Sequence, residues 1–326
     1  MILAGDLGGT KTLLALYREV SGRVETIREE AFKSQDFPQF EQVLKRFLEG
    51  SGQLQIRAMC LGVPGPVIDG RCKTTNLPWH LDEQQLAKAF GVKTVRLLND
   101  LQAAAYGMLF LPASEMVALN QGNTLETKGN IAVIAAGTGL GEAFLYWDSR
   151  NYFPVASEGG HVDYAPQGDR EIELFRFLRS EFGHVSYERI LSGPGLFNIY
   201  RFLRDTGFSS EPAWLREKLQ GGDPGLTITQ IGLARGHDLC IETLDLFASI
   251  YGSEAGNLAL KVLAVGGVYI GGGIAPKILD KLKEGAFMRA FSNKGRYTDL
   301  LMQIPVRVAL NSRAALIGAA HYALRI

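Results

Sequence analysis

The chain has 326 residues, and its 34 Lys and Arg balance 34 Asp and Glu, so the formal net charge is zero. This length allows roughly two domains with ample core, and the charge balance argues against nucleic acid or an anionic membrane surface as the main partner. The three cysteines, Cys60, Cys72 and Cys240, show neither a disulfide framework nor zinc-site spacing. Without an export signal or a spanning apolar run near the N-terminus, we expect a cytoplasmic protein.

Strand-like and helix-like patterns alternate along the chain, which favours an α/β fold. The first part predicts a β-meander over residues 2–32, strands over 58–63 and 95–98, and helices over 37–49, 82–90 and 101–109. Pro112 then marks a domain switch. We therefore expect a small α/β domain over residues 1–110.

The second part predicts a large α/β domain over residues 111–310. We expect strands over 116–119, 131–135, 268–270 and 306–309, and helices over 170–182, 195–205, 211–219, 223–235, 238–264, 276–283 and 313–324. The helix over 276–283 is expected to begin with Pro276 in its first turn. The long helix contains Gly252 and Gly256, at which it could bend. The last helix, within 311–326, is expected to return to the small domain.

Segments 2–17 and 131–146 resemble one another, since each reads as an apolar strand, a tight Gly/Thr turn and a second apolar strand. A turn with unpaired N–H groups beside a hydroxyl suits a phosphate, although ordinary β-hairpins share the pattern. No Gly-Lys-Ser or Gly-Lys-Thr of a Walker loop occurs, and Glu142 stands where a Rossmann fingerprint needs its third glycine. Phosphate binding at these turns would therefore use hairpins.

The pair Asn99-Asp100 follows a predicted strand. Ligands in α/β folds favour the carboxyl ends of strands, so Asp100 is a candidate catalytic base. The alternative is that Asp100 only caps the following helix, whose N-terminus would also hold its carboxylate ionised.

The polar cluster Ser157–Asp163 contains Glu158 and His161, separated by two glycines that let both face one space. A carboxylate and an imidazole could bind sugar hydroxyls, whereas a surface turn would look the same. A metal alternative also exists, because Glu158–His161 and Glu181–His184 are both ExxH segments, but their glycines spoil helical spacing. Glu188, before a Ser-Gly-Pro-Gly breaker, reads as an exposed helix residue by itself. Gly271–Gly273 permits either a flat ligand or close packing.

Taken together, these segments resemble the bacterial-type glucokinase family of the actin/hexokinase/Hsp70 ATPase superfamily. The resemblance is carried in order by Gly5–Thr10, Leu98–Asp100, Gly137–Gly141, Glu158–His161, Glu188–Gly195 and Gly271–Ile274, over most of the chain. It implies two lobes of ribonuclease-H-like, actin-like ATPase topology around a central cleft. Lys11 departs from the Asn of many members.

The resemblance also implies roles for individual residues. Asp100 would be the general base. Asn99, Asp100, Glu158, His161 and Glu188 would bind the sugar. ATP would be held by Gly5, Asp6, Gly8, Gly9, Thr10, Gly137, Thr138, Gly139, Gly272 and Gly273. Asp6 would contact Mg²⁺ indirectly, through water.

The implied activity is ATP-dependent phosphorylation of D-glucose to glucose 6-phosphate by a homodimer. Two alternatives stay open: a sugar-binding regulatory sensor without turnover, and a polyphosphate-dependent hexokinase. The intact Asp100 and both phosphate turns favour the kinase over the sensor.

Overall fold

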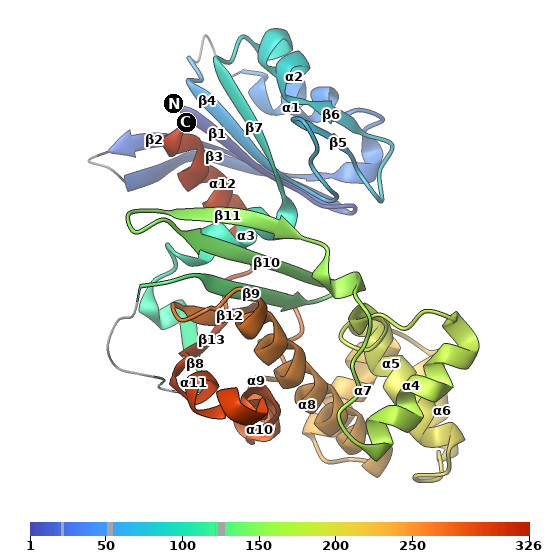
Figure 1. Ribbon diagram of the computed structural model, residues 1–326. Helices are drawn as coiled ribbons and strands as arrows, with labels where there is room; N and C mark the ends of the chain where they lie inside the picture. The colour runs from blue at the N-terminus through green and yellow to red at the C-terminus, as the bar shows by residue number, and fades with distance from the viewer. Residues whose placement is uncertain (21–22, 51–54, 121, 123–127) are drawn as a thin grey trace. The chain divides into compact units, whose positions relative to one another are not determined.

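The computed structural model describes residues 1–20, 23–50, 55–120, 122 and 128–326, which divide by their contacts into two compact units (Figure 1). Unit 1 contains Met1–Ala113, Tyr152–Ala156 and Asn311–Ile326. Unit 2 contains Ser114–Asn151 and Ser157–Leu310. Each unit has its own sheet and helices, so the predicted α/β class is confirmed.

The sheet of unit 1 has the order β3-β2-β1-β4-β7. Its strands are β1 (Ile2–Leu7), β2 (Lys11–Val20), β3 (Arg23–Lys33), β4 (Ala58–Val63) and β7 (Thr94–Asn99). The first three form the predicted antiparallel meander, whereas β1, β4 and β7 are parallel. Every residue of β4 is buried, as expected for a parallel strand covered on both faces.

Helices cover both faces of this sheet. They are α1 (Phe40–Leu48), α2 (Glu83–Phe90), α3 (Asp100–Met108) and α12 (Ala314–Arg325). The unit also contains η1 (Ser34–Asp36), the two-stranded sheet of β5 (Arg71–Lys73) and β6 (His80–Asp82), and all but the last residue of the strand β11 (Tyr152–Ser157). One core lies among the sheet, α1 and α2, and another among the sheet, α3 and α12. A Cβ on Gly318 would lie 1.9 Å from the Ala103 carbonyl oxygen. This close crossing of α12 and α3 fixes the helix that begins with Asp100.

The sheet of unit 2 repeats the topology around β1. Its strands β10 (Leu140–Trp147), β9 (Ile131–Ala136), β12 (Gly267–Gly271), β13 (Val306–Ala309) and β8 (Met116–Ala118) are neighbours in that order. As in β2-β1-β4-β7, an antiparallel hairpin is followed by two parallel strands. The two similar sequence segments therefore occupy equivalent places in two sheets.

The remaining elements of unit 2 are helical. They are α4 (Asp169–Phe182), α5 (Gly193–Asp205), α6 (Ala213–Gln220), α7 (Pro224–Leu233), α8 (Asp238–Lys261), α9 (Leu279–Lys283), α10 (Ala286–Ser292) and α11 (Thr298–Gln303), with η2 (Ala113–Glu115), η3 (Gly159–His161), η4 (Tyr187–Arg189) and η5 (Gly295–Tyr297). Helix α8 is continuous across both of its inner glycines. A Cβ on Gly252 would lie 2.0 Å from the Phe287 carbonyl oxygen, so this glycine lets α10 approach.

Two predicted helix starts are wrong. Helix α1 begins at Phe40 rather than Phe37, because Phe37 precedes a proline and its carbonyl accepts a bond from Trp79 Nε1. Helix α9 begins at Leu279 rather than Pro276. The preceding segment is a run of turns, tied to β9 by the bond from Ile274 N–H to the Ala136 carbonyl.

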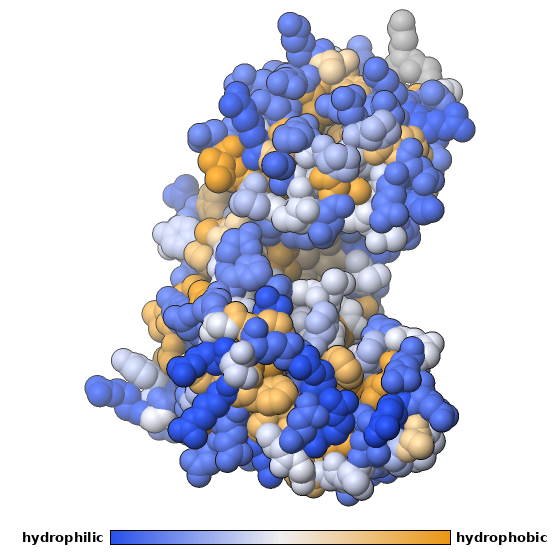
Figure 2. Space-filling model, turned by 90° about the vertical axis from the view of Figure 1, so that its right-hand side faces the viewer, coloured by the Kyte–Doolittle hydropathy of each residue, from blue (hydrophilic) through white to orange (hydrophobic). Residues whose placement is uncertain are grey.

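Within the described ranges, no helix is both long and apolar enough to cross a bilayer. Hydrophilic side chains cover most of the face shown in Figure 2, with hydrophobic ones in small patches among them.

Candidate functional site

The first Gly/Thr turn joins β1 to β2 and is shaped by its own backbone and by Ser34. The N–H of Gly8 donates to the Lys11 carbonyl at 3.0 Å. The Ser34 hydroxyl donates to the Gly8 carbonyl at 2.7 Å, and the Ser34 N–H donates to the Thr10 carbonyl at 3.0 Å. Ser34 was not anticipated, since a lone serine after a strand carries no signal. The turn is a fixed loop whose geometry suits an anion.

Asp6 is a partly buried residue near the end of β1, ahead of this turn. Burial and the negative charge of Asp100 raise its pKa to about 6, and the ammonium of Lys11 acts in the opposite direction. The charge of Lys11, the position that departs from the family pattern, therefore acts on Asp6. The negative charges of the Asp6 and Asp100 carboxylates repel each other, and a cation bound nearby would reduce this repulsion.

The helix that follows the strand β7 is capped by Asn99 rather than by Asp100. Asn99 is the N-cap of α3: its Oδ1 accepts from Leu101 N–H and Gln102 N–H, and Gln102 completes a capping box. Asp100 is instead the first helical residue and is exposed, and its Oδ1 accepts a hydrogen bond from Leu101 N–H at 2.7 Å. The helix therefore has its cap without Asp100, so capping does not account for this carboxylate.

Asn99 is only 8% exposed, and its side chain also makes a structural hydrogen bond. Its Nδ2 donates to the Gly65 carbonyl at 3.2 Å. An amide has two N–H hydrogens, so this bond uses one of the two donors. The backbone fixes the orientation in which Asn99 could present the other.

The second Gly/Thr turn joins β9 to β10 and meets the start of α5. Gly137 N–H donates to the Gly139 carbonyl, and Gly193 N–H donates to the Gly137 carbonyl, both at 2.8 Å. Ser192 caps α5, because its Oγ accepts from Gly195 N–H at 3.0 Å. The Ser-Gly-Pro-Gly segment thus brings a helix N-terminus beside the turn, an arrangement that favours phosphate.

Gly272 lies against the same part of unit 2. Its φ is +81°, and a Cβ there would lie 2.2 Å from the Ala136 carbonyl oxygen. Only glycine accepts both the conformation and the approach. A Cβ built on Gly137 would lie 3.9 Å from Gly273 N. The Gly271–Gly273 segment therefore adjoins the second turn, as expected if both serve one nucleotide.

Glu188 joins the second turn to the predicted sugar ligands. Its Oε2 accepts a hydrogen bond from Leu140 N–H at 3.0 Å, and its Oε1 lies 3.9 Å from His161 Nδ1. Glu158 precedes η3 and is exposed, with its carbonyl accepting from His161 N–H. Unit 2 therefore brings His161, Glu188 and the turn together, with Glu158 at the start of the same short helix.

The metal alternative based on paired ExxH segments is not supported by the geometry. Gly159–His161 is a short 3₁₀ helix rather than an α-helix. In the other segment Glu181 pairs with Arg201, and His184 pairs with Asp163. Across the residues that the structure describes, no group of three or more His, Cys, Asp or Glu could hold a metal ion.

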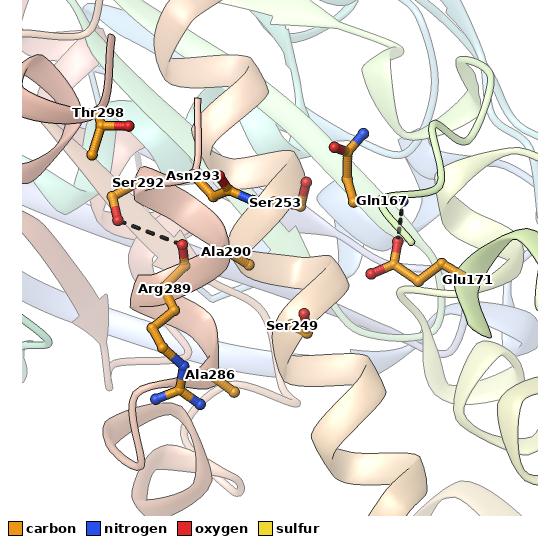
Figure 3. A pocket seen from close by; sticks show the side chains of 10 residues that line it. All are labelled: Gln167, Glu171, Ser249, Ser253, Ala286, Arg289, Ala290, Ser292, Asn293 and Thr298. Atoms are coloured by element: carbon orange, nitrogen blue, oxygen red, sulfur yellow. Dashed lines mark hydrogen bonds between the residues drawn. The ribbon is translucent and has the colours of Figure 1, made fainter. Parts of the chain in front are cut away.

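A pocket of about 520 Å³ lies elsewhere in unit 2, between α8, α10 and the start of α4 (Figure 3). Its wall includes Glu171, which accepts from Gln167 N–H at 2.9 Å. None of the predicted site residues lines this pocket, so it is separate from the site built above.

Comparisons with known proteins agree with one another. A family model described as Glucokinase matches residues 3–326. A protein of Nostoc punctiforme named Glucokinase is 39% identical over 340 residues, covering 100% of this chain and 99% of the relative. Another Glucokinase, from Saccharophagus degradans, is 34% identical and covers 98% and 96%.

Solved structures show the same similarity. A glucokinase from an Antarctic psychrotroph superposes with a TM-score of 0.88 at 31% identity, covering 100% of this chain and 99% of that one. A ROK family glucokinase from Streptomyces griseus, solved with glucose and AMPPNP, superposes with a TM-score of 0.64 at 22% identity, covering 100% and 99%. This second likeness shows the fold, which is that of the actin-like sugar kinases.

Proposed function

The chain belongs to the glucokinase family, and from that premise we propose that it transfers the γ-phosphoryl group of ATP to the 6-hydroxyl of D-glucose, with Asp100 as general base. Membership of the family supports glucose kinase activity for the whole chain. The observation that carries the assignment to Asp100 is that Asn99, not Asp100, caps α3. Asp100 is exposed at the first position of α3, where its carboxylate could accept a proton from a bound sugar.

In this mechanism Asp100 takes the proton of the sugar 6-hydroxyl as that oxygen attacks the γ-phosphorus. The bond from phosphorus to the bridging oxygen breaks, and ADP leaves with the electron pair. Phosphoryl transfer depends mostly on positioning and on charge stabilisation. General-base catalysis adds about 10²–10⁴-fold.

The two turns would hold the phosphates of ATP. Gly8, Gly9 and Thr10 supply the first, and Gly137, Thr138 and Gly139 supply the second, which has the α5 N-terminus beside it. Backbone N–H groups and a helix dipole stabilise phosphate charge without an excess of basic residues, consistent with the neutral chain. Gly272 and Gly273 would pack against the adenosine.

Mg²⁺ fits the carboxyl group of Asp6. The mutual charge penalty between Asp6 and Asp100 is what a nearby cation would relieve, and Mg²⁺ keeps several waters while using few carboxylates. Asp6 would therefore hold it through water, and the bound ion would neutralise phosphate charge. Gly5 lies within β1, and a Cβ there would be only 2.7 Å from Leu61 Cδ2 on β4. We therefore propose that Gly5 supports the nucleotide site indirectly, by letting side chains pack closely against β1.

The sugar hydroxyls would be bound by Asn99, Glu158, His161 and Glu188. Glu188 is the best supported, because its contact with Leu140 N–H fixes its carboxylate in place. A site built on specific hydroxyls rejects analogues that lack them by up to about 10⁴–10⁵. We therefore propose a preference for glucose over other hexoses. Homodimer assembly and cytoplasmic localisation remain predictions.

The test is a matrix of hexoses against phosphoryl donors, with ADP release and sugar phosphate both measured. Glucose with ATP should give the highest kcat/KM. Sugar binding without ADP release would establish the sensor, and faster turnover with polyphosphate would establish the other kinase. Faster turnover of fructose or N-acetylglucosamine would overturn the sugar assignment.

A further inference from the structure

Unit 2 contains a buried pair of carboxyl groups that the proposed mechanism does not use. Glu142, on β10, is 1% exposed, and Glu254, on α8, is 0% exposed. The two carboxyl groups are close enough for the charge of Glu254 to act on Glu142. Glu254 also accepts from Asn257 Nδ2 at 2.8 Å and from Lys261 Nζ at 3.1 Å. Buried polar groups of this kind are costly unless they are paired.

The charges around the two carboxyl groups favour a neutral Glu142. Glu254 accepts from the Lys261 ammonium, and the charge of Lys294 also interacts with it. Burial and the charge of Glu254 raise the pKa of Glu142 to about 8. The neutral form of Glu142 is therefore favoured at neutral pH.

Glu142 lies directly beneath the turn that joins Glu158 to His161. A Cβ on Gly159 would lie 2.0 Å from Glu142 Oε2, and a Cβ on Gly160 would lie 2.0 Å from the Leu140 carbonyl oxygen. The short helix η3 thus rests on the first residues of β10. The side-chain support comes from Glu142, whose Oε1 has no hydrogen-bond partner among the described atoms.

The carboxyl groups of Glu142 and Glu254 are also connected to the segment that contains Glu188. Asn257 Nδ2 donates to both the Tyr187 hydroxyl, at 3.0 Å, and Glu254 Oε2, at 2.8 Å, and so links the two side chains. Tyr187 is 2% exposed and opens η4, immediately before Glu188. One buried network therefore touches both segments from which unit 2 would bind sugar.

We propose that buried Glu142, packed against Gly159 and next to Glu254, is a positioning residue that sets the sugar-binding geometry of the Glu158–His161 turn and of Glu188. It touches neither sugar nor ATP and acts through Gly159 and Tyr187. This inference rests on the proposed function only in taking those segments as the sugar site. Because Glu142 is neutral and Glu254 is paired with the Lys261 ammonium, the two side chains support both segments without an uncompensated charge.

The test compares Glu142→Gln and Glu142→Ala at pH 6.5, with glucose affinity measured by calorimetry and KM and kcat by ADP release. The amide keeps the shape and neutrality of Glu142, so glucose affinity should stay within about threefold of wild type. Alanine removes the support, and misplacement of binding groups should weaken glucose affinity by about tenfold or more, with a much smaller effect on the KM for ATP. An alanine variant that is folded and binds glucose as wild type does would overturn the proposal.

Glu211→Gln and Glu211→Ala are the matched controls. Glu211 is also a buried carboxylate of unit 2, but it is held by Tyr200 and Arg216. Its variants should lower the melting temperature without changing glucose affinity. Equal losses of glucose affinity in the two series would mean that Glu142 is merely structural.

A pH series covers the case in which Glu142→Ala does not fold. The titratable groups that face or influence the pair are Glu254, Lys261, Tyr187, Tyr251 and Lys294. The KM of the wild type for glucose should rise above pH 8, as Glu142 ionises, whereas Glu142→Gln should lack that rise. Parallel profiles would contradict the proposal. If the wild type itself does not phosphorylate glucose, the proposed function fails, while calorimetric glucose binding still decides the role of Glu142.

Discussion

The Glu188 carboxylate accepts a hydrogen bond from the backbone N–H of Leu140 at 3.0 Å. Leu140 directly follows the second Gly/Thr turn, so a predicted sugar ligand and a predicted phosphate loop share one contact. Sugar and nucleotide affinity should therefore be coupled through this bond.

Replacing Gly139 by Ala should displace Glu188. A Cβ at this position would lie 2.4 Å from Glu188 Oε2, much closer than real atoms approach. Glucose affinity, measured by calorimetry without nucleotide, should fall by about tenfold or more, because a misplaced group loses its binding contacts. Gly137→Ala is the matched control, since its nearest neighbour would be 3.9 Å away. Equal effects of the two substitutions would count against the contact.

Glu188→Gln should weaken sugar binding more than it slows the chemical step. Hydrogen bonds to a charged group contribute about 1.5–3 kcal/mol, so the KM for glucose should rise by roughly 10–100-fold. Glu181→Gln, which alters a carboxylate paired with Arg201, should leave the KM unchanged. A loss of kcat with an unaltered glucose KM would contradict the sugar-binding role.

The stability of the fold should depend on pH through Glu142. In the unfolded chain its carboxyl loses a proton near the ordinary pKa of 4.5, whereas burial and Glu254 raise the folded pKa to about 8. The folded state therefore binds more protons between these values, and its contribution to stability is lost as pH rises. Against Glu142→Gln, the wild type should lose at least about 1 kcal/mol between pH 5 and 8. A constant difference in unfolding free energy over that range would be inconsistent with the raised pKa.

Asp6→Asn should increase the Mg²⁺ concentration needed for half-maximal activity. The amide cannot supply the charge that favours a hydrated cation. Because burial and Asp100 raise the pKa of Asp6 to about 6, Asp6 is ionised at pH 8 and its charge destabilises the fold there, so the variant should be no less stable at that pH. Activity assays over a Mg²⁺ series, with melting curves, check both points. An unchanged Mg²⁺ requirement would remove Asp6 from the metal site.

Much of the fold could be predicted from local patterns. The two hairpins, the buried strand over 58–63 and the helix after Asp82 are found where periodicity and capping residues indicated. The helix expected from Pro276 failed because contacts with β9 hold that segment in turns. Such long-range bonds leave no local sequence signal.

The candidate site shows the same limit. Gly-rich turns and strand ends pointed to Asp6, Asp100 and Gly139. In the sequence, Glu142 indicated only that a Rossmann motif is absent. Its buried position next to Glu254 could not be predicted, because Glu254 lies on α8, far away in the sequence. Ser192 and Gly193 read as a helix breaker, and only the folded chain brings them to the second turn.

The most direct measurement of the central claim is the turnover of Asp100→Asn together with its glucose affinity. Because Asn99 caps α3, the variant should fold and bind glucose nearly as the wild type does, while kcat should fall by at least about 10²-fold. Asp82→Asn, which alters an aspartate that does cap its helix, should lower stability and spare kcat. Near-normal turnover by folded Asp100→Asn would contradict its role as the general base.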